Sequence, residues 1–400
     1  MTVEQSQAPA GGPLIPLHCL RHAEPGPPRL AALPTGTPVW VVTRHADVRQ
    51  ALTDPRLDRA SLYAPGAPPV TVIPNILDAP DTLLNIDGPE HQALRRTVQR
   101  AFTPRAIERW RPWVASVVED LIDGLAASGS PADVVAAFSR PLPVQVICRL
   151  MGLDHNELTK LADWSEHALS ATAYTAEEIQ QAMQEFGAFG YQLVLERRKN
   201  PGDDLVSSLV LAADETGGAS EIQLTMLVIG LVLAGHETTM TTLGNAIVYL
   251  LDEDREAWAR IGADQEAAVQ ATEQALRTIP LGDNLTGPGL LRRANADLEI
   301  GGVTIPAGSI VAADAGTANH DPEVYPPGID LFAPLGTPSL TFGAGPHHCL
   351  GAWLARMELE LGLHGLARRF PELRLTEPTT DISWRTGLMT RSPLSLQVAW

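Results

Sequence analysis

The segment Phe342-Gly-Ala-Gly-Pro-His-His-Cys-Leu-Gly351 is the most specific stretch of the chain, and the pattern of an amphipathic helix follows it. Cys349 would lie at the N-terminus of that helix, where free backbone N–H groups and the helix dipole lower the pKa of a thiol. Glycines 343, 345 and 351 would let the backbone pass close to a flat ligand, because they lack a Cβ. The segment therefore predicts an iron ligand. The alternative is a helix-capping loop around an inert cysteine.

A zinc site made by His347, His348 and Cys349 is a weaker interpretation of the same segment. Zinc is usually held by four ligands at characteristic spacings, and these three adjacent residues do not have them.

The composition excludes several broad classes of protein. A net charge of −18 leaves no basic footprint for a general nucleic-acid binder. The longest strongly apolar run, 226–234, falls well short of the ~20 residues that a membrane-spanning helix needs, and the N-terminus shows no apolar core of a signal peptide. Three widely separated cysteines make a poor disulfide framework and indicate a reducing compartment. We therefore expect a cytoplasmic protein that binds neither nucleic acid nor membranes.

The rest of the pattern predicts a mostly α-helical (α+β) fold with small β-sheets. Residues 1–36 are rich in Pro and Gly and predict a flexible N-terminal arm, followed by a single domain over 37–400. Ser220 and Gln223 form a capping box, and the helix they open is predicted to reach about Leu251, roughly 45 Å at 1.5 Å per residue. Strands are predicted at 39–42 and, as a hairpin, at 298–300 and 303–305, with an irregular loop over 61–89. Further helices are predicted over about 45–52, 103–125, 141–151, 155–170, 176–199, 204–213 and 265–278.

The cysteine segment resembles the haem-binding loop of the cytochrome P450 superfamily. It matches the family pattern FGxGxHxCxG at each fixed position, and Ile305-Pro-Ala-Gly308 looks like bacterial members. The resemblance covers nearly the whole chain, and it implies the P450 fold, with a long central helix over haem b (iron protoporphyrin IX). The residues that it assigns to the haem in this loop are Phe342, Gly343, His347, Cys349 as the iron ligand, and Gly351.

Haem carries two propionates, which need charge-assisted partners when the cofactor is buried. His91 and Arg95 lie four residues apart on one predicted helix and match the family's HxxxR propionate pair, although the spacing alone would also suit a solvated surface pair. The resemblance implies the same role for Arg292 and His347. Because Arg293 is adjacent to Arg292, a slip of one residue would exchange the two arginines.

The long helix has a polar interruption, Ala234-Gly-His-Glu-Thr-Thr239. Glycine, an acid and threonines all weaken the interior of a helix, yet apolar positions resume beyond them. The segment is similar to the family's [AG]Gx[DE]T[TS] motif, whose groove holds dioxygen and a chain of water. This implies that Ala234 lies at the haem, that Thr238 hydrogen-bonds the oxygen being activated, and that Glu237 relays protons from bulk water.

One predicted helix departs from the family, whose ExxR motif is here Gln274-Ala-Leu-Arg277. A second arginine that the family places before the cysteine loop is missing too, and Ala333 stands about where it is expected. A buried charge without a partner is costly. The paired loss therefore predicts a rebuilt neutral network, in which Arg277 bonds the Gln274 amide oxygen and backbone carbonyls of the 320–335 coil.

Residues 91–111 hold six arginines with only Glu108 opposing them, and Arg356 follows the cysteine loop. A basic patch on an acidic protein indicates a specific acidic partner, with a solvated helix face as the alternative. In the family, the face behind the cysteine receives an iron–sulfur ferredoxin. The resemblance therefore implies electrons from NAD(P)H, delivered by a ferredoxin reductase and a ferredoxin.

The substrate pocket is predicted between five mostly apolar segments, which favours a hydrophobic or amphipathic small molecule. These segments are 61–89, 168–180, 229–234, 281–291 and 387–390.

The sequence therefore predicts a monomeric monooxygenase of the bacterial type, which splits dioxygen and hydroxylates or epoxidises a secondary metabolite. A haem-thiolate oxidase that performs ring closure, coupling or desaturation without inserting oxygen fits the same residues, and the sequence does not separate the two. A catalytically idle haem protein that recruits a partner is a third hypothesis. The altered ExxR motif permits it, but the retention of Glu237 and Thr238 argues against it.

Overall fold

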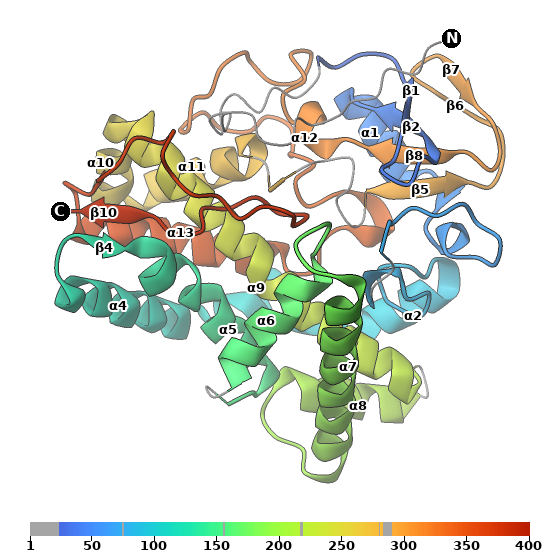
Figure 1. The fold of residues 1–400 in the computed structure, drawn as a ribbon, viewed down its shortest axis with the longest axis horizontal. Helices are drawn as coiled ribbons and strands as arrows, with labels where there is room; N and C mark the ends of the chain where they lie inside the picture. Colours follow the sequence, from blue (N-terminus) through green and yellow to red (C-terminus); the bar gives the residue numbers. More distant parts are fainter. Residues whose placement is uncertain (1–23, 74–75, 155–156, 217–218, 280, 283–289) are drawn as a thin grey trace.

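The computed structural model describes residues 24–400 apart from 74–75, 155–156, 217–218, 280 and 283–289. Helices form most of the molecule, and the largest sheet lies at one end of it (Figure 1). The helices are α1 (His45–Thr53), α2 (Gly88–Gln99), α3 (Pro104–Glu108), α4 (Arg111–Ser128), α5 (Pro141–Met151), α6 (Leu158–Ala168), α7 (Ala176–Lys199), α8 (Leu205–Thr216), α9 (Glu221–Asp252), α10 (Arg255–Ala263), α11 (Gln265–Thr278), α12 (Ala315–Ala318) and α13 (Ala352–Arg369). The strands are β1 (Arg29–Ala32), β2 (Pro38–Val42), β3 (Leu57–Asp58), β4 (Ala132–Asp133), β5 (Leu291–Ala294), β6 (Leu298–Ile300), β7 (Val303–Ile305), β8 (Ile310–Ala313), β9 (Arg374–Leu375) and β10 (Gln397–Ala399).

The described residues form three small sheets beside the helices, so the predicted fold class is confirmed. The largest has the strand order β1-β2-β8-β5-β3, in which β2 and β8 run parallel and place Val39 opposite Ile310. Strands β4, β10 and β9 form a second sheet. The β6–β7 hairpin has the predicted bounds, and Gly301 and Gly302 in its turn have φ of +55° and +80°, which glycine adopts without strain.

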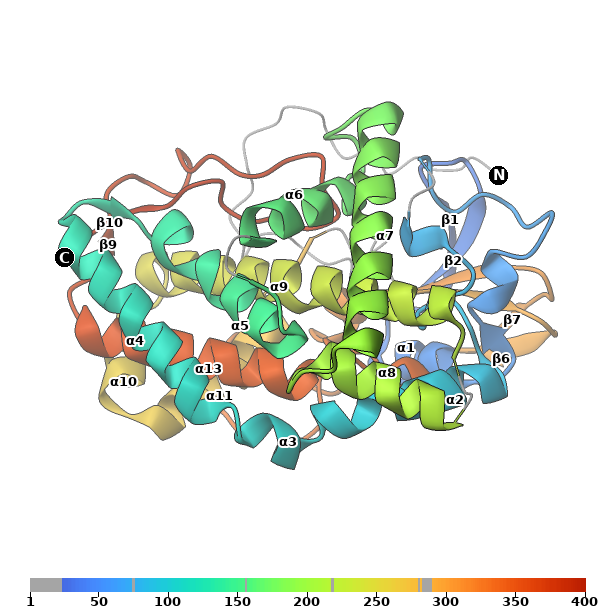
Figure 2. The ribbon, with the colours of Figure 1, turned by 90° about the horizontal axis from the view of Figure 1, so that it is seen from below.

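Helix α9 runs through the middle of the molecule, with α13 beside it and α7 crossing it (Figure 2). It begins as predicted, because Ser220 accepts the Gln223 N–H and the Gln223 side chain accepts the Ser220 N–H. By its length and composition α9 could cross a membrane, but 67% of its most apolar 18-residue stretch is buried inside the protein. This burial identifies α9 as a core helix.

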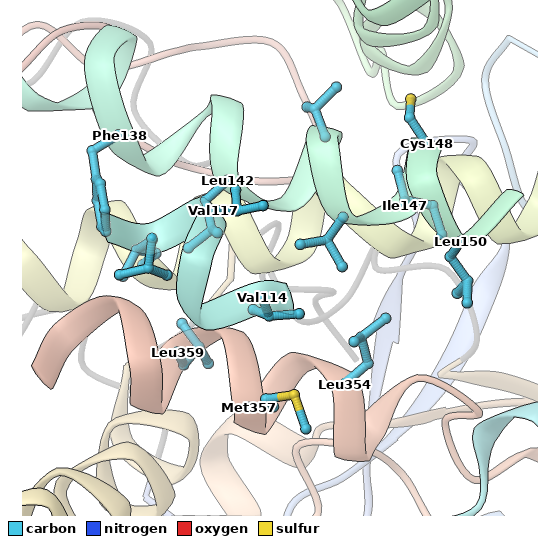
Figure 3. Close-up of a cluster of buried hydrophobic side chains, with 14 of the residues drawn as sticks. Val114, Val117, Phe138, Leu142, Ile147, Cys148, Leu150, Leu354, Met357 and Leu359 are labelled. Atoms are coloured by element: carbon cyan, nitrogen blue, oxygen red, sulfur yellow. The ribbon is translucent and has the colours of Figure 1, made fainter. Parts of the chain in front are cut away.

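Helices α4, α5 and α13 contribute to one continuous hydrophobic core around α9. Figure 3 shows Val114 and Val117 of α4 near Leu142 of α5 and Leu354 of α13, and all four are buried. Burying a side chain of this size stabilises the fold by about 1.5–3 kcal/mol. Cys148 of α5 belongs to the same core.

The single helix predicted from Thr103 towards Leu125 is wrong, because two helices, α3 and α4, occupy this stretch. Pro112 explains the break: it has no N–H to donate, and its ring clashes with the carbonyl of Glu108, where α3 ends. The predicted cap is confirmed, since the Thr103 hydroxyl accepts the N–H of Ala106 at 3.3 Å.

Part of the segment predicted as an N-terminal arm forms a strand. Residues 29–32 form β1, which pairs with β2 and places Arg29 opposite Val41; backbone pairing with a buried strand outweighs the local excess of Pro and Gly. Residues 1–23 of the predicted arm lie outside the described residues. Helix α10 was not predicted, although Asp254 caps it by accepting the N–H of Ala257 at 3.0 Å.

Candidate active site

The cysteine loop precedes α13 and is closed by its own backbone. The N–H of Cys349 donates to the carbonyl of Phe342 at 2.9 Å. Gly343 and Gly345 both have positive φ, +70° and +71°. A Cβ at Gly345 would lie 2.8 Å from the Leu52 carbonyl oxygen, so the loop requires glycine there.

The Cys349 side chain is accessible at the start of α13 but lies deep among protein atoms. Burial raises the pKa of this thiol, although N–H groups of Gly351 and Ala352 and the charges of Arg95 and Arg356 favour the thiolate. The predicted lowering of the thiol pKa by backbone N–H groups is present, but the net shift of the pKa for the thiol on its own is upward. The N–H groups and arginines are in place, but they do not outweigh the desolvation of a buried anion.

His91 and Arg95 share one face of α2 and lie beside the cysteine loop. The His91 ring lies 4.3 Å from that of His347, centroid to centroid, and Arg95 donates to the carbonyl of His348. Within the described part of the chain, the buried Nε2 atom of His91 has no hydrogen-bond partner. Burial lowers the pKa of His91 to about 4, with smaller contributions from His347 and Arg95, so its ring is neutral at pH 7.

Arg292 and Arg293 are separated by the alternation of β5. Arg292 is only 2% exposed, whereas Arg293 donates to the carbonyls of Gly308 and Ser61 on the other side. Burial, followed by the charge of Arg59, lowers the pKa of Arg292 to about 9. The buried guanidinium groups of Arg292 and Arg59 repel each other, and an anion bound beside them would offset that repulsion.

Arg59 and Asp87 belong to the same polar cluster, and sequence reasoning missed both. Arg59 donates to the carbonyl of Leu84 at 2.8 Å and to the Asn85 side chain at 2.8 Å, so it holds residues 84–85 in place. His347 Nε2 lies 2.8 Å from Asp87 Oδ1. Burial acts to raise the pKa of Asp87, but hydrogen bonds from His347 and backbone N–H groups lower it overall.

A strip of small residues is accessible in the middle of α9, which is otherwise largely buried. Gly230, Ala234 and Thr238 are spaced four apart on one face, and each is at least partly exposed. A Cβ at Gly230 would meet no atom within 4 Å. The Thr238 hydroxyl donates to the carbonyl of Ala234 at 3.1 Å. On the other side, Gly235 allows close approach, since its Cβ would lie 2.7 Å from Ile147 of α5.

Glu237, next to Thr238 in the sequence, is buried, since only 3% of its surface is exposed. Its carboxylate pairs with Arg385, and the Thr390 hydroxyl donates to it at 3.2 Å. Arg385 was not predicted as a partner. Glu237 therefore has almost no direct contact with bulk water, and its predicted relay of protons from bulk water stays a prediction.

The predicted neutral network around Arg277 is confirmed in its main contacts. Arg277 Nε donates to Gln274 Oε1 at 2.8 Å, and Gln274 Nε2 donates to the Ala333 carbonyl at 2.7 Å. The second acceptor of Arg277 is the Asn319 carbonyl at 2.7 Å, one residue before the predicted coil. Glu273 points elsewhere and pairs with Arg356.

Two of the segments predicted to wall the pocket, 168–180 and 387–390, lie against each other. The backbone N–H groups of residues 171–173 donate to the carbonyl of Gly387. Another predicted wall, 281–291, lies largely outside the described residues.

These features fit a haem. An accessible thiol, glycines that leave the faces of a flat ring free, an unpartnered buried His91 Nε2 and the buried charge of Arg292 are what a haem with two carboxylates would require.

Comparisons with known proteins agree with this geometry. The family model for cytochrome P450 matches residues 158–398, more than half of the chain. The nocardicin C N-oxygenase of Nocardia uniformis subsp. tsuyamanensis is 40% identical over 92% of this chain and 91% of its own length. The mycinamicin IV hydroxylase/epoxidase of Micromonospora griseorubida is 42% identical, again over 92% and 91%. A solved cytochrome P450 described as having biaryl coupling reactivity superposes with a TM-score of 0.87 at 34% identity, over 94% of this chain and 93% of that one. The chain therefore belongs to the cytochrome P450 family, and it is a haem-binding monooxygenase of the bacterial type.

Proposed function

We propose that this enzyme hydroxylates or epoxidises a hydrophobic or amphipathic small molecule of bacterial secondary metabolism, as a cytoplasmic monomer whose catalytic domain includes β1. The observation that carries the proposal is the accessible strip Gly230, Ala234 and Thr238 within a buried helix. A helix core opens to small and polar side chains in this way where a ligand must approach the backbone closely. The named substrates of the two curated relatives are products of secondary metabolism, which supports the substrate class.

Each residue around the proposed haem has a distinct role. Cys349 would ligate the iron, and His91, Arg95, Arg292 and His347 would hold the propionates. The backbone at Phe342, Gly343 and Gly351 and the small side chain of Ala234 would leave room for the ring. Haem with a thiolate ligand supplies the activation of dioxygen.

Two residues of α9 would take part in proton transfer. Thr238 would release its bond to Ala234 and donate to the oxygen being activated, while Glu237 would pass protons towards it. Glu237 is buried and its carboxylate is held by Arg385 and by the Thr390 hydroxyl, the latter being a group that can both accept and donate a proton in a relay.

Thr238→Ala is expected to retain haem and substrate binding but to divert electrons into hydrogen peroxide. Loss of one positioned donor in a proton-transfer step reduces its rate by about 10²–10⁴-fold, so the product formed per NAD(P)H should fall severalfold or more. The assay measures product, peroxide and NAD(P)H consumption together. Thr225→Ala is the matched control, because Thr225 makes the same type of bond to the carbonyl of Glu221 near the start of α9. Equal coupling in the two variants would contradict the role of Thr238.

The proposed electron donor is a ferredoxin, which would dock behind the cysteine loop. A groove of about 780 Å³ lies there between α3, α4, α11 and α13, with Trp353 and Arg356 among its lining residues. Arg111 is neutralised by Glu108 and Glu360, and Arg356 by Glu273. Within the described chain, the arginines of this face that are exposed and lack an ion pair are Arg96, Arg100, Arg105 and Arg109.

Reduction by an acidic ferredoxin is expected to slow as salt increases, because exposed charges are screened over about 10 Å at 0.1 M. Arg100→Glu should slow reduction, while substrate affinity stays unchanged. Stopped-flow reduction across a salt series measures this. Arg374→Glu, at an exposed arginine on β9, is the control. A reduction rate that is independent of salt would count against docking at this face.

The test of the function itself is a binding screen on purified protein, following the spin-state shift of the Soret band, with turnover of the hits by a surrogate ferredoxin and reductase. A product heavier by one oxygen atom supports the proposal. Ring closure, coupling or desaturation without oxygen insertion is the second candidate, and the solved relative with biaryl coupling reactivity favours it. A product that has lost hydrogen and gained no oxygen would establish that alternative.

A further inference from the structure

Arg59 carries a buried positive charge that has no side-chain ion pair among the residues that the structure describes. The residue is 2% exposed, and its guanidinium donates to uncharged oxygens, among them the Leu84 carbonyl and Asn85 Oδ1, each at 2.8 Å, and the Leu291 carbonyl at 3.1 Å. The nearby Asp87 carboxylate accepts the backbone N–H of Arg59 at 2.7 Å instead. A buried charge of this kind is costly, and an anion bound nearby would stabilise it.

Two guanidinium groups meet at the carbonyl of Leu291. This oxygen accepts a hydrogen bond from Arg59 Nη1 at 3.1 Å and another from Arg292 Nη1 at 2.8 Å. Arg292 is one of the residues proposed to hold the haem propionates. Because electrostatic attraction is strong over short distances in a buried site, a propionate held by Arg292 would also stabilise the charge of Arg59.

Asn85 connects Arg59 to the predicted wall of the substrate pocket. Its side chain is fully buried, and while Oδ1 accepts from Arg59, Nδ2 donates to the carbonyl of Leu77 at 2.6 Å. The Leu77 side chain packs against a buried cluster that contains Leu233 of α9, the residue before Ala234 of the accessible strip. A chain of contacts therefore runs from the residues around the proposed haem to the strip on α9.

We propose that Arg59 is a positioning residue that couples haem binding to the placement of Leu77 in the wall of the substrate pocket. Negative charge at the propionate positions holds the Arg59 guanidinium, the guanidinium holds Asn85, and Asn85 holds the backbone of Leu77. Because coupling between two sites is reciprocal, an ordered 77–85 segment also strengthens the retention of haem. The inference rests on the proposed propionate role of Arg292 and on no step of the proposed oxidation.

The first test reconstitutes the full chain with haem or with haem dimethyl ester, which has the same ring but no propionate charge. Hydrogen–deuterium exchange with mass spectrometry then measures the backbone protection of residues 76–86. We expect exchange there to be about fivefold faster or more with the ester, the lower end of typical coupling between two sites, and peptides of α4 and α10 to stay unchanged. In Arg59→Gln the segment should exchange at this faster rate with either ring. Equal protection with the two rings in the parent protein would overturn the proposal.

The second test measures haem loss as the transfer of haem to excess apomyoglobin, followed in the Soret region. Arg59→Gln and Asn85→Ala should each speed transfer about fivefold or more, although the Asn85 side chain bonds none of the residues proposed to hold the haem. The double variant should be no faster than the faster single variant, since both interrupt the same contacts. Arg293→Gln is the matched control, because Arg293 of β5 also donates to backbone carbonyls, those of Ser61 and Gly308, and its transfer rate should stay that of the parent.

The proposed propionate site and the proposed coupling fail in different ways. If the ester leaves the parent protein no faster than haem does, the propionate role of Arg292 is wrong and the inference falls with it. If the ester leaves faster but Asn85→Ala retains haem like the parent, the propionate site stands and the coupling is overturned. Additive effects in the double variant, or an equal effect of Arg293→Gln, would also overturn the coupling. A failed monooxygenase assay would leave all of these results unaffected.

Discussion

Cys349→Ser is expected to abolish the red-shifted Soret band that the reduced protein forms with carbon monoxide. That band depends on a thiolate ligand to the haem iron, and serine would provide a hydroxyl that is far less acidic and a poor iron ligand. Cys349 is placed for the role by three features: its accessible side chain, the N–H groups of Gly351 and Ala352 aimed at its sulfur, and the charge of Arg95 nearby. Absorption spectra of the dithionite-reduced protein with carbon monoxide measure the result.

Cys148→Ser is the matched control, and its band should be unchanged. Cys148 lies in the core between α5 and its neighbours, and burial raises the pKa of its thiol to about 12, with a smaller contribution from Glu157. A thiol in that setting stays protonated and does not bind metal. An intact red-shifted band in Cys349→Ser would disprove the ligand assignment.

Arg277→Ala is expected to be the most destabilising single change outside the cysteine loop. The residue is 6% exposed, and its guanidinium donates to Gln274 and to the Asn319 carbonyl and lies 4.8 Å from the centre of the Tyr325 ring. Alanine would leave both oxygens buried without a donor, at roughly 1–3 kcal/mol each, and would open a cavity beside the tyrosine. We expect the protein to lose haem or fail to fold, measured as haem content and Tm.

Gln274→Glu tests whether the network is rebuilt or merely damaged. A glutamate would gain attraction to Arg277 but lose the bond from Gln274 Nε2 to the Ala333 carbonyl, which a carboxylate cannot donate. The two effects oppose each other, so the Tm should move only slightly. Glu273→Gln is the adjacent control: it removes a partly exposed ion pair with Arg356, worth about 0–1 kcal/mol. A large rise in Tm for Gln274→Glu would contradict the rebuilt network, because it would show that an ion pair with Arg277 is more stable than the neutral contacts.

Local sequence signals predicted much of the fold because they act within a few residues. The capping box at Ser220 located the start of α9, and the Gly301-Gly302 pair located a hairpin to the residue. The missed break at Pro112 is also local and could have been read from the sequence, as could the cap at Asp254.

Residues of the site could be predicted only where they lie together in one short sequence motif. Cys349 and Thr238 lie in such segments. Arg385 contacts Glu237 across 148 residues of sequence, and Arg59 contacts the carbonyl of Leu291 across 232. No periodicity or composition connects residues so far apart, since only the packed fold decides which of 29 basic side chains reaches a given acid.

The attachment of residues 171–173 to one carbonyl bears on how the enzyme can be redesigned. Every bond in it is made by main-chain N–H groups, and the side chains of these residues are exposed. Any residue but proline supplies the same donor. Mutant libraries can therefore introduce any residue except proline at these three positions without removing the attachment, whereas any replacement of Gly387, which has φ of +74°, would be strained and would bring a Cβ to 2.8 Å from the backbone nitrogen of Ala173. Because the sequence predicts that 168–180 lines the substrate pocket, we expect libraries at 171–173, with residue 387 left fixed, to change substrate preference.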